Sequence, residues 1–93
     1  MNILKISYCP KCRWLMRAAW MQQELLVTFE EEVHEFILSP SEVSGTFDVF
    51  ANGKLVYSRK QEGAFPELKL LKQIIRDEIA PNKSLGHSDN KKE

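Results

Sequence analysis

The sequence predicts an α/β protein, a two-layer sandwich in which both helices cover one face of a four-stranded mixed sheet, with the element order β-α-β-β-β-α. Three observations predict it. Four short segments alternate apolar and polar residues, two longer segments repeat apolar residues at helical spacing, and an Asn-Gly pair separates two of the alternating segments. With 93 residues the chain can bury one modest core, so we expect a single domain over residues 1–81.

The first half of the chain reads as strand, helix, strand. Residues 2–8 alternate apolar and polar side chains, which is typical of a strand with one buried face. Residues 12–29 contain no Gly or Pro and carry a broad apolar stripe, so they predict a long helix. Residues 31–39 favour a second strand. The right-handed crossover rule makes this strand parallel to the first.

The second half reads as a hairpin followed by a helix. Residues 46–51 and 54–58 are strand-like, and the Asn-Gly pair between them accepts the positive φ angles of a tight hairpin turn. Pro66 suits the first turn of a helix over residues 66–80. Residues 82–93 are polar and have no period, so we expect a disordered C-terminal tail.

The charge balance excludes several classes of partner. The 13 Lys and Arg residues equal the 13 Asp and Glu residues in number, so no global field attracts nucleic acid or an anionic membrane. No apolar run approaches the ~20 residues that span a bilayer. The first residues lack the pattern of a signal peptide, so we expect a cytoplasmic protein. We also expect a monomer or a weak homodimer.

Both cysteines of the chain fall in one short motif, Cys9-Pro10-Lys11-Cys12. The motif joins the end of the first predicted strand to the start of the first predicted helix. Unpaired N–H groups and the dipole at a helix N-terminus stabilise a thiolate, and the cations of Lys11 and Arg13 act in the same direction. Pro10 restricts the loop and keeps the two sulfurs within bridging reach. The motif therefore predicts a redox-active dithiol with no cofactor and no metal.

Four other interpretations of the cysteine pair stay open. The two residues can simply be incidental buried thiols. A structural disulfide is disfavoured because it would close a very small loop in a reducing compartment. A zinc site needs about four ligands, and only His34 and His87 are left to add to the pair. The pair can also act as a non-catalytic redox sensor in a protein-interaction module. C-P-x-C at a strand-to-helix junction favours the redox interpretation, and we expect thiol-disulfide exchange, although enzymatic turnover stays open.

Four stretches together resemble the selenoprotein W-like family, the Rdx group of the thioredoxin-like superfamily, in its bacterial members with cysteine in place of selenocysteine. They are YCPKCRW at 8–14, GTFDV at 45–49, FPELK at 65–69 and LGHSD at 85–89. The resemblance implies a thioredoxin-like fold and a thiol-disulfide function in cell redox homeostasis. It also implies a protein disulfide or a glutathione-like small thiol as the partner.

The predicted topology brings two more segments to the sheet edge that holds the cysteines. The start of the third strand and the exit of the fourth strand form an expected substrate rim of Ser44, Gly45, Thr46, Phe47, Arg59 and Lys60. Gly45 would let a bound thiol approach the backbone closely. Arg59 and Lys60 would bind carboxylates of a glutathione-like partner, unless they are simply solvated loop residues.

The chain departs from thioredoxin-like proteins in one respect, and the resemblance does not decide which of the two cysteines is the nucleophile. Those proteins place a cis-proline before the third strand, where this chain has Ser44-Gly45-Thr46, and Pro40 lies too early to replace it. The family's selenocysteine occupies the position of Cys12. We nevertheless expect Cys9 to attack, because it precedes the helix and should be the more exposed, and Cys12 to resolve.

Two further side chains are candidates for roles beside the cysteine pair. Trp14 follows Cys12 by two residues, so it either shields the sulfurs or belongs to the core. His87 would act as a base if its polar segment folded back onto the site.

Overall fold

The computed structural model describes residues 1–89, except for the side chains of His87 and Ser88. The expected order β-α-β-β-β-α is confirmed, with a one-turn helix added after the last strand and a 3₁₀ turn near the C-terminus. The elements are β1 (Asn2–Tyr8), α1 (Leu15–Thr28), β2 (Val33–Pro40), β3 (Phe47–Ala51), β4 (Lys54–Ser58), α2 (Arg59–Glu62), α3 (Leu68–Ile79) and η1 (Gly86–Asp89).

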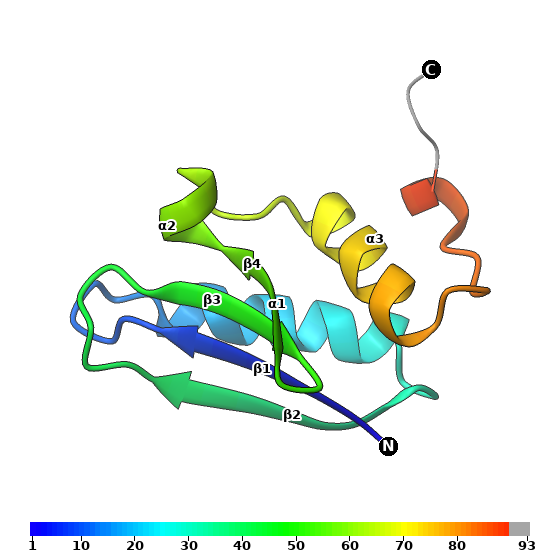
Figure 1. The fold of residues 1–93 in the computed structure, drawn as a ribbon, viewed down its shortest axis with the longest axis horizontal. Coiled ribbons are helices and arrows are strands. Elements are labelled where there is room, and N and C mark those ends of the chain that lie inside the picture. The colour runs from blue at the N-terminus through cyan, green and yellow to red at the C-terminus, as the bar shows by residue number, and fades with distance from the viewer. Residues whose placement is uncertain (90–93) are drawn as a thin grey trace.

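The four strands form one mixed sheet in the order β2-β1-β3-β4 (Figure 1). Strand β1 is parallel to β2 and antiparallel to β3, and β3 is antiparallel to β4. Tyr8 at the end of β1 pairs with Pro40 on one side and with Phe47 on the other. The end of β1, the end of β2 and the start of β3 therefore meet at one edge of the sheet.

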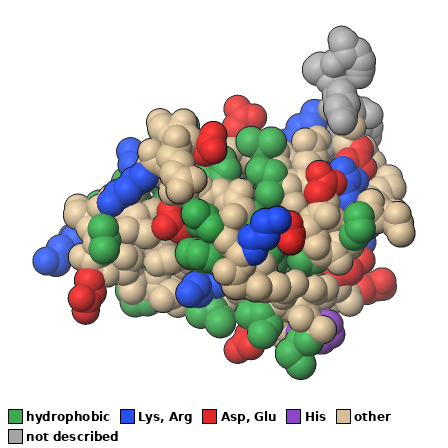
Figure 2. Space-filling model, in the orientation of Figure 1, with side chains coloured by type: hydrophobic (Ala, Val, Ile, Leu, Met, Phe, Trp, Pro, Cys, Tyr) green, Lys and Arg blue, Asp and Glu red, His purple; other side chains and the backbone are tan. Residues whose placement is uncertain are grey.

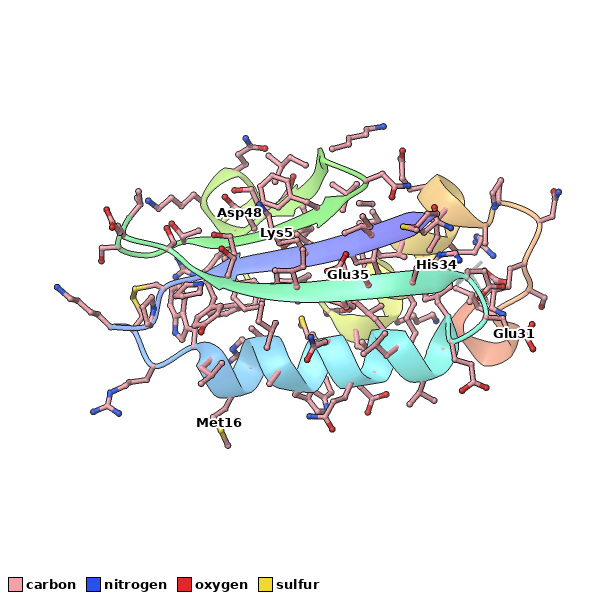
Figure 3. The ribbon with its side chains drawn as sticks, turned by 90° about the horizontal axis from the view of Figure 1, so that it is seen from below. Lys5, Met16, Glu31, His34, Glu35 and Asp48 are labelled. Carbon is pink, nitrogen blue, oxygen red and sulfur yellow. A yellow bond between two sulfur atoms is a disulfide. The ribbon has the colours of Figure 1, made fainter. Side chains whose placement is uncertain are left out.

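Both long helices pack on the same face of the sheet, as the sequence predicts. Alternate residues of β1 and β3 point to this face and join α1 and α3 in a single apolar core. Figure 3, which views the molecule from below, shows α1 running along one side of the sheet with Met16 pointing away from it. The fully buried core side chains include Leu4, Ile6, Leu25, Phe29, Phe47, Val49, Leu71 and Ile75.

The first helix begins later than the sequence predicts. It starts at Leu15 rather than at residue 12, because Arg13 has a φ of 66°, which a right-handed helix cannot contain. The N–H of Arg13 donates to the carbonyl of Pro10 at 3.0 Å and closes a turn. Cys12 therefore lies in this turn and not in the helix. The third helix likewise begins at Leu68, two residues after Pro66.

The segment that follows α3 is held against the body of the protein up to Asp89. The guanidinium of Arg76 donates to the carbonyl of Lys83 at 2.8 Å and to the carboxylate of Asp89 at 2.9 Å. Leu85 packs against the core. This segment lies at the end of the molecule opposite the β1–α1 connection (Figure 1).

The expected domain boundary at residue 81 and the expected disorder over 82–93 stay predictions. The expectation for the His87 side chain lies outside the described residues. Within those residues, no helix is both long enough and apolar enough to cross a membrane.

Candidate functional site

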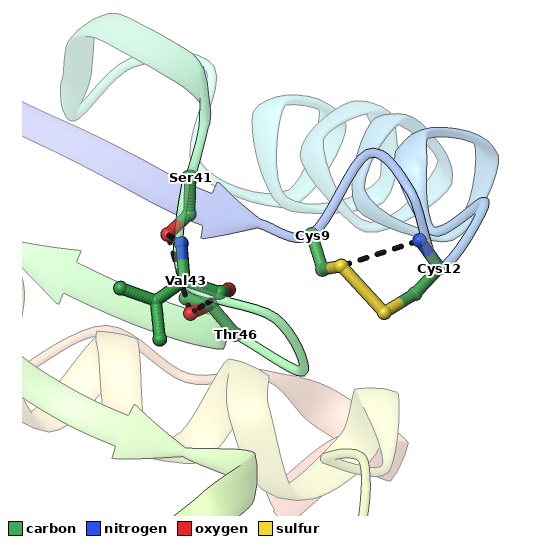
Figure 4. Close-up of a disulfide and its surroundings, with 5 residues drawn as sticks. All are labelled: Cys9, Cys12, Ser41, Val43 and Thr46. Atoms are coloured by element: carbon green, nitrogen blue, oxygen red, sulfur yellow. Dashed lines mark hydrogen bonds between the residues drawn. A yellow bond between two sulfur atoms is a disulfide. The ribbon is translucent and has the colours of Figure 1, made fainter.

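The two cysteines lie at the sheet edge where β1, β2 and β3 meet. Cys9 directly follows β1, and its N–H donates to the carbonyl of Thr46 at 2.8 Å, which fixes it to the start of β3. Cys9 and Cys12 form a disulfide with a Cα–Cα distance of 5.3 Å (Figure 4). The sequence prediction that Pro10 keeps the two sulfurs within bridging reach agrees with this geometry.

One backbone group is aimed at the first sulfur. The N–H of Cys12 donates to the Sγ of Cys9 at 3.2 Å (Figure 4). The left-handed conformation of Arg13 follows directly after this residue. The sequence assigns thiolate stabilisation to the first turn of the helix. In the structure that turn begins only at Leu15, and the hydrogen bond comes from the loop itself.

The exposure of the two cysteines is the reverse of the expectation. Cys9 is only 2% exposed, whereas Cys12 is partly exposed on the outer turn of the loop. The expectation was wrong because Cys9 continues the central strand and is tied to Thr46. A molecule arriving from solvent therefore reaches the sulfur of Cys12 more readily.

A pocket of about 450 Å³ opens beside the disulfide. Pro40 contributes to its wall because Pro40 pairs with Tyr8, the residue before Cys9. The peptide bonds of the described residues are all trans, so Pro40 contributes to the wall without being a cis-proline. The lining residues are Cys9, Pro10, Lys11, Pro40, Ser41, Glu42 and Ser44.

Hydrogen bonds within the loop over residues 41–46 hold the far wall of this pocket. The N–H of Val43 donates to the Oγ of Ser41 at 3.0 Å, and the hydroxyl of Thr46 donates to the carbonyl of Val43 at 2.7 Å. The hydroxyls of Ser41 and Thr46 lie 3.2 Å apart (Figure 4). Thr46 is thus a buried anchor for the loop as well as for Cys9.

The structure brings together most of the expected substrate rim. Ser44 lines the pocket, and Gly45 has a φ of 81°. A Cβ at Gly45 would lie 3.4 Å from the Cε of Lys60, so these two residues are neighbours. Phe47 is fully buried and therefore cannot form part of a surface rim.

Trp14 belongs to an aromatic cluster beneath the loop. Its ring centroid lies 4.8 Å from that of Phe65 and 6.5 Å from that of Phe47. The guanidinium of Arg59 lies 4.8 Å from the centroid of Trp14. Arg17 lies 4.0 Å from the centroid of Phe65 on the outside of the cluster. Trp14 packs against the core, in agreement with the core interpretation, and its shielding of the sulfurs stays a prediction.

Sequence reasoning missed Phe65 and Arg17. Arg17 lies three residues after Trp14 on the predicted helix, and this spacing could have placed it near that ring. Phe65 is reached only through the tertiary structure. The hydroxyl of Tyr57 donates to the carbonyl of Ala64 at 2.7 Å and holds the segment that carries Phe65. Burial, and secondarily the charge of Glu62, raise the pKa of Tyr57.

A metal site at the cysteine pair would need further ligating side chains beside the two cysteines. No group of three or more His, Cys, Asp and Glu side chains in the described part of the chain is arranged to hold a metal ion.

Known proteins share this arrangement of sequence and fold. A selenoprotein W-related protein from Vibrio cholerae is 49% identical, with a TM-score of 0.78 over 82% of this chain and 94% of that one. A protein of known structure from Bordetella parapertussis is 45% identical, with a TM-score of 0.80 over 84% of this chain and 98% of that one. No curated protein matches the chain.

These neighbours are consistent with the thioredoxin-like α/β fold that the resemblance implies. The family model named Rdx family matches residues 3–77, a range that includes both cysteines, the 41–46 loop, Arg59 and Phe65. The sequence motif, the fold and these similarities agree, and the chain belongs to the Rdx family.

Proposed function

We propose that this protein exchanges thiols and disulfides through the couple formed by Cys9 and Cys12. The observation that carries the proposal is the disulfide at the β1–α1 connection, whose buried sulfur accepts the N–H of Cys12 at 3.2 Å. A hydrogen bond to sulfur favours its charged form, and the thiolate is the species that reacts in exchange. We place the activity in the cytoplasm, as part of cell redox homeostasis.

The exposures favour Cys12 as the cysteine that meets the partner. In the reduced protein, the Cys12 thiolate attacks one sulfur of a substrate disulfide, forms a mixed disulfide and releases the first substrate thiolate. The Cys9 thiolate then attacks the Cys12 sulfur, closes the internal disulfide and releases the second substrate thiolate. The two released substrate thiolates take up the protons that Cys9 and Cys12 lost when they formed thiolates. The substrate disulfide is reduced by two electrons and the protein is oxidised by two.

The cycle is completed by a thiol reductant that attacks the more exposed sulfur of the internal disulfide. Attack at Cys12 releases Cys9 as the leaving thiolate, which keeps the N–H of Cys12 as a donor. A second thiol then attacks the reductant sulfur of the mixed disulfide at Cys12, forms the disulfide of the reductant and releases the Cys12 thiolate. The partner is a protein disulfide or a glutathione-like small thiol, and the two sulfurs carry both electrons without a cofactor.

Equilibration against glutathione buffers, followed by a turnover assay, tests the proposal. We expect a reversible two-electron couple with a potential above about −270 mV, the thioredoxin value, because Lys11 and the N–H of Cys12 favour the reduced, charged form. We expect many substrate equivalents to be reduced per protein when a thiol reductant is supplied.

Two other results would reject the proposal. A single exchange per protein without turnover would identify a redox sensor instead. Stoichiometric zinc in the purified protein, by elemental analysis, would identify a metal-binding domain. The Cys9→Ser and Cys12→Ser variants are the controls, and each should abolish turnover.

A further inference from the structure

Five cations that form no ion pair among the described residues belong to the cysteine loop and its neighbours. Away from the cysteines, Lys54 pairs with Glu78 at 3.1 Å and Lys83 pairs with Glu32 at 3.2 Å. Arg76 forms a pair with Asp89 at 2.8 Å. Lys5, Lys69 and Lys72 form no ion pair within the described part of the chain, and neither do the five cations around the cysteine loop. These five are Lys11, Arg13, Arg17, Arg59 and Lys60.

Contacts place these five side chains around the disulfide, although they come from three segments. Lys11 lies between the cysteines and Arg13 follows them. Lys60 lies beside Gly45, the neighbour of the residue that holds Cys9. Arg59 contacts the rings of Trp14 and Phe65, and Arg17 contacts the ring of Phe65.

Two of these arginines, Arg17 and Arg59, contact aromatic rings and form no ion pair with an acid among the described residues. Arg59 lies 4.8 Å from the ring centroid of Trp14 and 5.0 Å from that of Phe65, and Arg17 lies 4.0 Å from the centroid of Phe65. A ring face attracts a guanidinium but leaves its N–H edge without an acceptor. The Nε of Arg59 is buried and has no hydrogen-bond acceptor among the described residues.

Few carboxylates oppose this charge at the same end of the protein. Glu42 lines the pocket and Glu62 is exposed on α2. Asp48 pairs across the strands with Ser58, the residue before Arg59, and its buried Oδ1 has no hydrogen-bond partner among the described residues. None of the three forms an ion pair with the five cations. Figure 2 shows Lys and Arg side chains at the end of the molecule where Figure 1 places the cysteine loop and α2. The whole chain has a net charge of zero, so this excess is local.

We infer that the surface around the disulfide selects substrates whose own disulfide is flanked by carboxylates. This inference rests on the proposed thiol-disulfide exchange and names the class of substrate for it. An acidic group beside the substrate sulfur would give the unpaired guanidinium and ammonium groups the acceptors that this chain does not supply. Carboxylates on a small disulfide and carboxylates on an acidic peptide offer the same chemistry.

Small disulfides of similar size and different charge test the inference. The probes are 3,3′-dithiodipropionate (dianion), bis(2-hydroxyethyl) disulfide (neutral) and cystamine (dication). The fully reduced protein is mixed with each probe, and formation of the internal disulfide is followed by mass spectrometry. Each rate is divided by the rate of the same probe with dithiothreitol, which removes differences in intrinsic reactivity.

At low salt we expect the normalised rates to fall from dianion to neutral probe to dication, over at least about tenfold. Near 1 M salt, where the screening length is about 3 Å, the range should narrow to about threefold or less. Lys60→Gln and Arg17→Gln should each lower the dianion-to-dication ratio by about two- to threefold at low salt. Lys54→Gln removes one exposed cation at the far end and should leave the ratio unchanged.

The outcomes separate this inference from the function on which it rests. Equal normalised rates for all three probes, or a ratio that Lys54→Gln lowers as much as Lys60→Gln does, would overturn the inference while exchange stands. No reaction with any probe would overturn the proposed function itself. Disulfide-linked peptides of equal length, one acidic and one basic, show whether the selected carboxylates belong to a polypeptide or to a small molecule. A preference for the acidic peptide assigns a polypeptide substrate, and a preference limited to the small dianion assigns a small acid.

Discussion

The backbone N–H of Cys12 points at the sulfur of Cys9, 3.2 Å away, across a turn that the two residues themselves close with their disulfide. The residue that offers its sulfur to solvent therefore also stabilises the sulfur that is buried. When the bond opens, this N–H stabilises negative charge on the buried sulfur. This relationship favours Cys12 as the cysteine that attacks the substrate and Cys9 as the cysteine that resolves the mixed disulfide.

Alkylation should distinguish the two thiols in the reduced protein. We expect iodoacetamide to modify Cys12 at least about tenfold faster than Cys9, because Cys9 is almost completely buried. Peptide mass spectrometry after short exposure measures both rates. In urea the rates should converge, which provides the control. Faster modification of Cys9 would restore the order of attack that the sequence alone predicts.

Arg13→Gly should stabilise the oxidised protein. A non-glycine residue at a φ of 66° is disfavoured by about 1–2 kcal/mol, and glycine loses about 0.5–1 kcal/mol more backbone entropy on folding, so we expect a gain of up to about 1 kcal/mol. Urea unfolding of the oxidised proteins measures this gain. Arg13→Ala removes the same charge but keeps the Cβ, so it should show no gain. Equal stability of the two variants would contradict the account.

Tyr57 should make the stability fall at alkaline pH. Burial, with the charge of Glu62 as the smaller cause, raises the pKa of Tyr57, so the folded state keeps a proton that the unfolded chain loses near pH 10. Stability therefore falls as the pH rises through the window above about 10. Tyr57→Phe should remove this fall and cost about 1 kcal/mol at pH 7 through the lost hydrogen bond to Ala64. Unchanged alkaline behaviour in the variant would refute the assignment.

Asp89→Asn should loosen the C-terminal segment without affecting redox chemistry. Asp89 accepts the N–H of Leu85 at 2.7 Å and pairs with Arg76, whose pKa its hydrogen bond raises. We expect the melting temperature to fall by a few degrees and the redox potential to stay the same, because this contact lies far from the cysteines. Asp77→Asn is the matched control. Asp77 also binds Arg76 but is 71% exposed, so its loss should matter less.

The sequence predicted the elements well and their ends less well. Alternation in residues 2–8 and the Asn52-Gly53 turn located β1 and the hairpin as the structure has them. The predicted start of the first helix was wrong because Cys12 and Trp14 are acceptable in a helix. No residue near Arg13 indicates that its backbone adopts a left-handed conformation. That conformation depends on how the loop is tied to Cys9 and to the start of β3.

The candidate site divides in the same way. The motif identified both cysteines, and topology placed Ser44, Gly45 and Lys60 near them. It also placed Phe47 there, although the side chain turns into the core, because residues along a strand point alternately to opposite faces. Phe65 follows a loop far along the chain, and nothing in its neighbourhood indicates a ring packed against Trp14.

By itself the sequence determined the α/β class, the order of the elements and the cysteine pair, since these depend on local periodicity and on residue identity. Only the tertiary structure decided which sulfur is buried, which N–H donates to it and which described cations form no ion pair. Those properties depend on distances between segments that are remote along the chain, such as Thr46 beside Cys9 and Arg59 beside Trp14. Burial and electrostatic pairing arise when these segments meet, so no single stretch of the sequence carries them.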